Sequence, residues 1–287
     1  MSARRIALAT SSSFPQMAPD DQLLEAWLRQ QGHEVAVQVW DEATDWERFD
    51  LVIVRSCWDY HRKRGQFLEW IQALRDASVN LLNPPAMLAW NHDKRYLQDL
   101  AERSIPIVET EWVEGGSSAD LMEILKRRGW SQAVIKPRVS ATAWKTSRTS
   151  LETARQDQAG LDTLLSEENV MVQGFVDEIV EVGEFSFLYF NGVRSHAVLK
   201  RASAGDFRVQ DEFAGTAHLV QPQAAVWSQA DAVLATLDEV PLYARVDGPL
   251  IDGTLHVLEL ELIEPALFLA VDPGAAARFG AAALGRL

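Results

Sequence analysis

The sequence predicts an α/β unit at the beginning of the chain and an α+β region after it. In residues 1–90, short apolar strands alternate with amphipathic helices in the order β-α-β-β-α-β, which is typical of a largely parallel sheet. After about residue 170 strand patterns dominate, and Asn191-Gly192 and Asp252-Gly253 mark hairpin turns. Apolar residues make up 47% of the chain and charged residues 24%, as in ordinary globular proteins. We therefore expect one compact molecule without low-complexity linkers.

The elements of the first ninety residues each have a recognisable pattern. Apolar runs predict strands at residues 5–10, 35–39, 51–54 and 79–82, and apolar side chains at helical spacing predict helices at 23–28 and 67–74. Gly32 is a suitable end for the first helix. Because ligands bind beyond the carboxyl ends of parallel strands, two loops are candidates for substrate contact. Their candidate residues are Ser11, Ser12, Arg55, Trp58 and Asp59.

The pattern changes from residue 91. A helix at 91–103, a strand at 110–113, a helix at 119–128 and a strand at 132–136 precede a hydroxyl-rich loop, 138–150. Strands at 170–175, 184–190 and 193–200, a helical stretch at 223–237, an acidic hairpin and an alanine-rich helix complete the chain. These changes predict three segments, residues 1–90, 91–172 and 173–287.

The acidic hairpin carries the strongest chemical signal. Leu258, Leu260 and Leu262 alternate with Glu259 and Glu261, which places both glutamates on one face of a strand, roughly 7 Å apart. Asp247 lies across the predicted hairpin, so that three carboxylates converge. Their mutual repulsion favours a cation, and oxygen ligands alone favour Mg²⁺. The alternative is an acidic, solvent-exposed face of an antiparallel sheet.

Lysines are uncommon in this chain, with only six among 27 basic side chains. Asn91 is a good N-cap, but Lys94 takes the place where a capping box has Glu or Gln. A lysine beside free N–H groups suits a phosphate. Lys136 ends an apolar strand and, if buried, needs an anionic partner. The alternative for Lys94 is a solvated surface lysine, and the alternative for Lys136 and the loop after it is a plain surface loop.

Two further segments offer weaker candidates. Residues 170–175 form an apolar strand in which Gly174 exposes backbone suited to an adenine edge, and acids from Asp177 onward lie within reach of a ribose. Lys200, Arg201 and Arg208 add cations. Core strand, surface acids and a basic turn account for these residues equally well.

Composition excludes several functions. The net charge of −14 argues against a nucleic-acid binder and against adsorption to an anionic membrane. Cys57 is the only cysteine, so no internal disulfide forms and a reduced, cytoplasmic setting is expected. The apolar run after the first residues is too short for a signal peptide. The sequence contains neither a Walker loop nor a Gly-x-Gly-x-x-Gly fingerprint, and its histidines lack zinc spacing.

Taken in order, the motifs resemble those of the ATP-grasp superfamily over nearly the whole chain. They are Asn91-x-Asp93-Lys94, Ile135-Lys136-Pro137, Val172-Gln173-Gly174-Phe175, Gly183-Glu184-Phe185-Ser186, Arg245-x-Asp247 and Glu259-x-Glu261-x₃-Pro265. The resemblance implies an ATP-grasp fold with an N-terminal Rossmann-like domain. Within the superfamily, the loop Arg55–Tyr60 and residues 258–269 resemble the cycloserine synthetase branch.

The resemblance also implies roles for residues. ATP would be held by Lys94, Lys136, Gln173, Gly174, Phe175, Asp177 and Glu184, and Mg²⁺ by Asp247, Glu259 and Glu261. Arg245, with Lys200 and Arg208, would act on the transferred phosphoryl group or acyl phosphate. Two features depart from the family pattern, because Glu261 stands where asparagine is common and the loop after Lys136 lacks the usual glycines.

The implied reaction is phosphorylation of a small-molecule carboxylate by ATP, followed by attack of an amine to form a C–N bond. In the cycloserine branch one molecule, O-ureido-D-serine, supplies both groups and closes a ring. The alternatives are a two-substrate amino acid or peptide ligase and a non-catalytic nucleotide-binding regulator of the same fold. A plain solute-binding module would leave Glu259 and Glu261 unexplained. Related enzymes are often dimers, so a homodimer is also expected.

Overall fold

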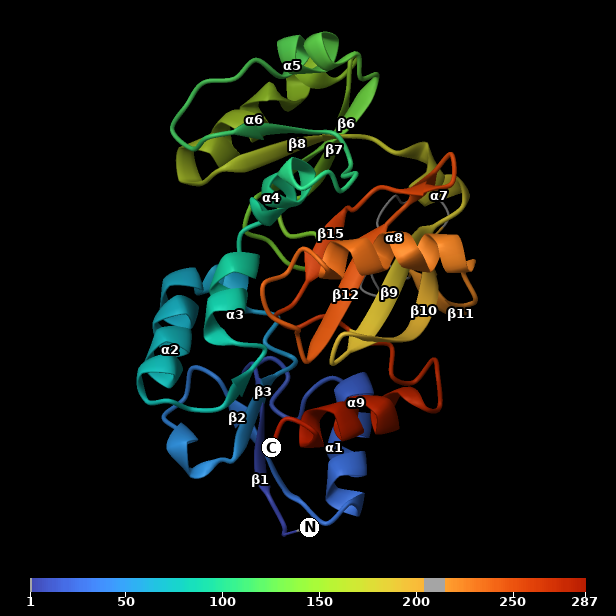
Figure 1. Ribbon diagram of the computed structural model, residues 1–287. Helices are drawn as coiled ribbons and strands as arrows, with labels where there is room; N and C mark the ends of the chain where they lie inside the picture. The colour runs from blue at the N-terminus through green and yellow to red at the C-terminus, as the bar shows by residue number, and fades with distance from the viewer. Residues whose placement is uncertain (1, 204–214) are drawn as a thin grey trace.

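The computed structural model describes residues 2–203 and 215–287. Three sheets lie one above another along the molecule, each formed mainly by one part of the chain (Figure 1). The N-terminal sheet, the five-stranded C-terminal sheet and the central sheet follow each other from bottom to top in this view. Arg208 falls outside the described residues. The boundaries of the three predicted segments remain a prediction.

The N-terminal sheet is wholly parallel and has the strand order β2-β1-β3-β4. Its strands are β1 (Arg5–Thr10), β2 (Glu34–Val39), β3 (Leu51–Val54) and β4 (Leu81–Leu82). Helices α1 (Pro19–Gln30), α2 (Arg64–Asp76) and α3 (Pro85–Asn91) and short 3₁₀ turns, η1 (Trp46–Arg48) and η2 (Tyr60–Arg62), accompany them. The expected alternation of strands and helices is confirmed.

The central sheet is antiparallel and has the order β5-β8-β6-β7. It contains β5 (Thr110–Val113), β6 (Gln132–Pro137), β7 (Ser147–Ser150) and β8 (Val170–Gly174). Helices α5 (Leu121–Arg128) and α6 (Ala154–Glu167) pack against it through an apolar core that includes Leu125, Leu161 and Ile135. The predicted loop 138–150 therefore ends in a strand, because Ser147–Ser150 pair with β6.

One predicted helix was wrong. Residues 91–103 are not continuous: α3 ends at Asn91, and α4 (Tyr96–Glu102) begins after a break that contains Lys94. Asn91 is not an N-cap. Its side-chain amide donates to the carbonyl of Leu260 at 2.8 Å and accepts from the N–H of Leu262 at 2.8 Å. Two long-range hydrogen bonds thus replace the local cap.

The C-terminal sheet is antiparallel and has the order β11-β10-β9-β12-β15. Its strands are β9 (Glu184–Phe190), β10 (Val193–Arg201), β11 (Thr216–Val220), β12 (Tyr243–Gly248) and β15 (Glu259–Glu261). The Asp252-Gly253 turn joins a separate small hairpin, β13 (Leu250–Ile251) and β14 (Thr254–Leu255). The short helix α7 (Asp177–Glu181) precedes β9.

The two faces of this sheet differ along β9. Phe187 and Tyr189 face helix α8 (Ala224–Leu234), whose Ala230 and Val233 share their apolar cluster. On the other face Leu188 and Phe190 pack toward the N-terminal domain and α9 (Ala275–Leu284). Toward the start of β9 this second face becomes polar, with Ser186 and Glu184, and the functional cavity opens there.

Candidate ATP and metal site

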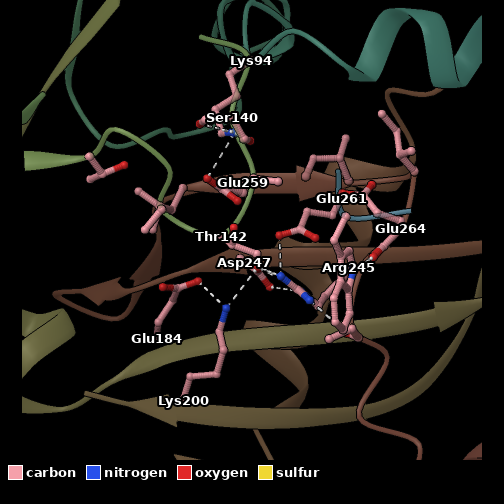
Figure 2. Close-up of a pocket in the computed structure, with 18 of the residues that line it drawn as sticks. Lys94, Ser140, Thr142, Glu184, Lys200, Arg245, Asp247, Glu259, Glu261 and Glu264 are labelled. Atoms are coloured by element: carbon pink, nitrogen blue, oxygen red, sulfur yellow. Dashed lines mark hydrogen bonds and ion pairs between the residues drawn. The ribbon is translucent and has the colours of Figure 1, made fainter. Parts of the chain in front are cut away.

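A cavity of about 860 Å³ lies between the three sheets and gathers most of the sequence-predicted site residues. Its walls come from β6, β8, β9, β10, β12 and β15, from the start of α1, and from three loops near residues 58, 140 and 265. Charged side chains and apolar ones such as Phe14, Phe175 and Phe268 line it together. Figure 2 shows the central part.

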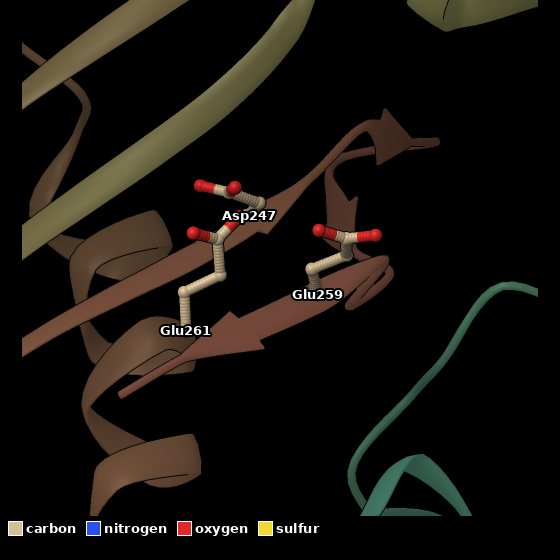
Figure 3. Close-up of side chains that lie close together, drawn as sticks. All are labelled: Asp247, Glu259 and Glu261. Carbon is tan, nitrogen blue, oxygen red and sulfur yellow. The ribbon is translucent and has the colours of Figure 1, made fainter. Parts of the chain in front are cut away.

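The three predicted metal carboxylates meet at the centre of the cavity (Figure 3). Antiparallel pairing of β12 with β15 sets Asp247 opposite Glu259 and Arg245 opposite Glu261. One carboxylate oxygen from each of Asp247, Glu259 and Glu261 lies within 4.8 Å of the others. Oxygen donors at this spacing fit a hard cation such as Mg²⁺, which keeps water or phosphate oxygens in its remaining positions.

Four cations surround these carboxylates, and Figure 2 labels three of them, Lys94, Lys200 and Arg245. Lys94 and Lys136 approach Glu259 at 3.6 and 3.7 Å, each with only 7% of its surface exposed. Lys200 bonds to Glu184 at 2.7 Å and to Asp247 at 3.2 Å. Arg245 binds Asp247 at 2.8 Å and also contacts Glu261. The cluster is thus charge-compensated by side chains that a phosphate could also engage.

The electrostatics divide the carboxylates into two kinds. Burial opposes ionisation of Glu259, but Lys94 and Lys136 outweigh it and lower its pKa to about 2. Burial dominates at Glu261 and raises its pKa to about 8, despite Arg245. Arg245 and Lys200 likewise lower the pKa of Asp247 against the effect of burial. Glu261 is therefore the carboxylate that most needs a further cation.

The predicted adenine segment lines one end of the cavity. Gln173, Gly174 and Phe175 lie there with Val108 and Val134. Gln173 donates to the hydroxyl of Thr110 at 3.1 Å, and the Arg148 guanidinium lies 3.9 Å from the centre of the Phe175 ring. Gly174 has a further role, since a Cβ there would come within 3.0 Å of the Trp130 ring.

Two predicted nucleotide contacts are placed differently from the others. Asp177 is exposed at the start of α7 and does not line the cavity. Glu184 does line it, but its carboxylate is bonded to Lys200.

The loop after Lys136 closes over the centre of the cavity. Ser140, Thr142 and Thr146 line the wall, and the Lys94 ammonium donates to the Ser140 carbonyl at 2.6 Å. Arg138 holds the loop at its start through two bonds of 2.9 Å to Asp93. Hydroxyl and backbone groups therefore stand where the ATP-grasp enzymes that the sequence resembles commonly have glycines.

Of the five candidates for substrate contact, only Trp58 lines the cavity. Ser11 and Arg55 are wholly buried, Ser12 is exposed at the surface, and Asp59 bonds to Trp40 and Lys63. Arg55 supports the cavity wall from behind, pairing with Asp21 at 2.9 Å and donating to the Pro265 carbonyl at 2.6 Å.

Sequence reasoning missed three acidic residues that line this end of the cavity, Asp20, Asp21 and Glu264. Asp20 and Glu264 line the cavity beside Phe14, Trp58 and Phe268. Asp20 accepts from the N–H groups of Leu269 and Ala270 at 2.9 and 2.8 Å. Glu264 could have been noticed as a carboxylate in the same apolar segment as Glu259 and Glu261.

Comparison with known proteins agrees with this arrangement. A family model for the N-terminal domain of the D-cycloserine synthetase DcsG matches residues 6–83. The cycloserine biosynthesis protein DcsG of Streptomyces lavendulae is 31% identical, with 92% of each chain covered. The chain belongs to the DcsG family of ATP-grasp ligases. This membership confirms the predicted ATP-grasp fold, the ligase class and the use of ATP.

Solved structures of such ligases superpose on the whole chain. The crystal structure of D-cycloserine synthetase DcsG has a TM-score of 0.87 at 28% identity and covers 99% of this chain and 100% of its own. D-alanine–D-alanine ligase from Bacillus anthracis has a TM-score of 0.71 at 15% identity, covering 99% of this chain and 97% of its own. The similarity to the D-alanine–D-alanine ligase, at 15% identity, shows the fold alone.

Among the described residues, no helix combines the length and the apolar character that crossing a membrane requires.

Proposed function

We propose that this ligase cyclises O-ureido-D-serine to D-cycloserine through an acyl phosphate. The observation that carries the proposal is the convergence of Asp247, Glu259 and Glu261 within 4.8 Å, flanked by Lys94 and Lys136 in one cavity. The identity to DcsG over 92% of the chain supports the substrate. The γ-phosphoryl group of ATP passes to the substrate carboxylate, and the ureido nitrogen that is bonded to oxygen then attacks the acyl carbon and expels phosphate. Hydrolysis of the carbamoyl group on that nitrogen, which leaves as carbamate and breaks down to carbon dioxide and ammonia, gives D-cycloserine.

The end of the cavity that holds the predicted adenine segment binds the nucleotide together with Lys94 and Lys136. Gln173, Gly174 and Phe175 contact the adenine, while Lys94 and Lys136 hold the phosphates as point charges. Asp247, Glu259 and Glu261 would hold Mg²⁺, which would supply positive charge against the negative charge that develops on the phosphates. The lysines then leave Glu259 for the phosphates, so that the metal replaces their charge.

Arg245 and Lys200 stabilise the transferred group. Both are 7% exposed and bonded to Asp247, which fixes their direction at the metal cluster. Because these donors are already oriented, little reorganisation accompanies transfer. Arg208, whose position is outside the described residues, is proposed as a third cation. Trp58 contacts the substrate at the opposite end from the adenine.

The test is phosphate release from Mg-ATP with O-ureido-D-serine as the only added substrate, with product mass measured in parallel. Release together with the cyclic product supports the proposal. Release only after addition of a second, amine-bearing molecule would indicate a two-substrate carboxylate-amine ligase instead. ATP binding without release across carboxylate and amine panels would indicate a regulator.

Two further expectations join this proposal. The single buried Cys57 and the biosynthetic relative support a cytoplasmic enzyme acting on a small molecule. We also propose a homodimer, because related ligases are often dimers. The acidic net charge argues against nucleic-acid and membrane partners. Light scattering in solution measures the oligomeric state directly.

A further inference from the structure

Residues 263–266 form a wall of the cavity that side chains from distant segments hold in place. Each of the four consecutive backbone carbonyls accepts a hydrogen bond from a different side chain. The donors are the Tyr243 hydroxyl to Ile263 (2.8 Å), the Trp58 indole to Glu264 (2.9 Å), Arg55 to Pro265 (2.6 Å) and Arg245 to Ala266 (2.9 Å). A backbone fixed at four successive positions presents its side chains at a defined place.

The carboxylate of Glu264 is presented to the cavity from this wall, 8% exposed. Across residues 2–203 and 215–287, no ion pair or hydrogen bond joins it to the side chain of another residue. The cations nearby are bonded elsewhere: Lys94 to Ser140 and Glu259, and Arg245 to Asp247 and Glu261. Figure 2 shows Glu264 beside Arg245 and Glu261.

A buried carboxylate without a counter-charge is costly, so a site of this kind favours a cationic ligand. The neighbouring walls are Trp58, Tyr60 and Phe268, which suit a small organic molecule rather than a second hydrated metal. Glu264 also stands only three residues beyond Glu261, on the segment that leaves the metal strand. A molecule whose carboxylate reaches the metal cluster would therefore bring a neighbouring group to Glu264.

We propose that Glu264 binds the α-ammonium group of an amino acid substrate and thereby selects amino acids over other carboxylic acids. This inference rests on the proposed function, because O-ureido-D-serine carries its ammonium one carbon from the carboxylate that is phosphorylated. Glu264 accepts charge-assisted hydrogen bonds from the ammonium and remains unchanged through the reaction. Its role is recognition, and the phosphoryl transfer stays at the metal cluster.

The experiment compares two ligands and three proteins. Isothermal calorimetry with Mg²⁺ and a non-hydrolysable ATP analogue measures O-ureido-D-serine against its desamino analogue, 3-(ureidooxy)propanoate. The proteins are the wild type, Glu264→Gln and Asp20→Asn. Asp20 is the matched control, because its oxygens line the same end of the cavity but already accept two backbone N–H groups.

The wild type is expected to bind the ammonium-bearing ligand about 10- to 100-fold more tightly than the desamino analogue, as one charged hydrogen bond provides. Glu264→Gln should reduce this preference to about threefold or less, while affinity for the ATP analogue and the melting temperature do not fall. An unchanged preference in Glu264→Gln, or its loss in Asp20→Asn instead, would overturn the inference. The inference would also be overturned if Glu264→Gln had a lower melting temperature and lost affinity equally for both ligands, because this result indicates a structural role.

Failure of the proposed function has a different signature. If the wild type releases no phosphate with O-ureido-D-serine, the cyclisation proposal fails. The amino acid that the enzyme does activate, found from the panels described above, then replaces O-ureido-D-serine in the same comparison with its own desamino form. If the enzyme activates only carboxylic acids without an amino group, the inference about Glu264 fails as well.

Discussion

The Arg55 guanidinium donates to the Pro265 carbonyl across 2.6 Å, joining residues that stand 210 positions apart in the sequence. The same guanidinium pairs with Asp21, and neither of these side chains is more than 3% exposed. The N-terminal domain thereby fixes the wall that bears Glu264. Arg55, expected from its loop to contact substrate, instead positions the wall that bears Glu264, the residue proposed to contact it.

Replacement of Arg55 by methionine should destabilise the protein by about 3–5 kcal/mol, because Asp21 would remain buried without its partner. Urea unfolding measures the difference. The double variant Arg55→Met/Asp21→Leu is the control, since removal of both charges should recover part of the loss. A single variant within about 1 kcal/mol of wild type would contradict the importance of this pair.

Lys94→Met and Lys136→Met should each weaken ATP binding about tenfold or more, because each removes a buried cation proposed to hold phosphate. Nucleotide titration by fluorescence or calorimetry gives the dissociation constants. Lys126→Met, on the exposed side of α5, is the matched control and should bind ATP as the wild type does. Normal ATP affinity in both active-site variants would remove the phosphate role.

Glu259 and Glu261 should respond differently to loss of charge. Glu259→Gln should raise the Mg²⁺ concentration for half-maximal activity about tenfold or more, since it removes a charged oxygen ligand. Glu261→Asn, which restores the residue common in ATP-grasp enzymes, should shift it less. Magnesium titration of phosphate release compares the two, with Glu123→Gln on exposed α5 as control. The reverse order would exclude Glu259 as the principal ligand.

The stability of the metal-free protein should depend on pH through Glu264. Burial raises its pKa from the usual 4.5 to about 8, despite Lys94 and Arg55. Between these values the folded protein retains a proton that the unfolded chain releases, so the free energy of unfolding falls as pH rises. Between pH 5 and pH 8, the free energy of unfolding measured with urea should therefore fall by roughly 2–5 kcal/mol more in the wild type than in Glu264→Gln. Parallel pH profiles for the two proteins would refute this.

The sequence revealed those parts of the site that depend on local periodicity. Alternation along residues 258–262 predicted two glutamates on one face, and the structure sets Asp247 opposite Glu259. Features that depend on distant partners were not predictable. Asn91 has the local features of an N-cap, yet its amide bonds to β15, about 170 residues later in the chain. Likewise, no local pattern distinguishes buried Ser11 and Arg55 from exposed loop residues.

The packing of α1 against α9 bears on the order in which the chain acquires its structure during synthesis. Gly280 allows contact so close that a Cβ there would lie 2.1 Å from the Trp27 ring. Leu24 and Leu28 share their apolar cluster with Phe279 and Ala283 (Figure 1). A ribosome delivers α1 before α9 and before all the strands and helices that lie between them in the chain. The part of the apolar face of α1 that α9 covers therefore stays exposed until α9 is synthesised, and this is the interval in which a chaperone would have most to protect.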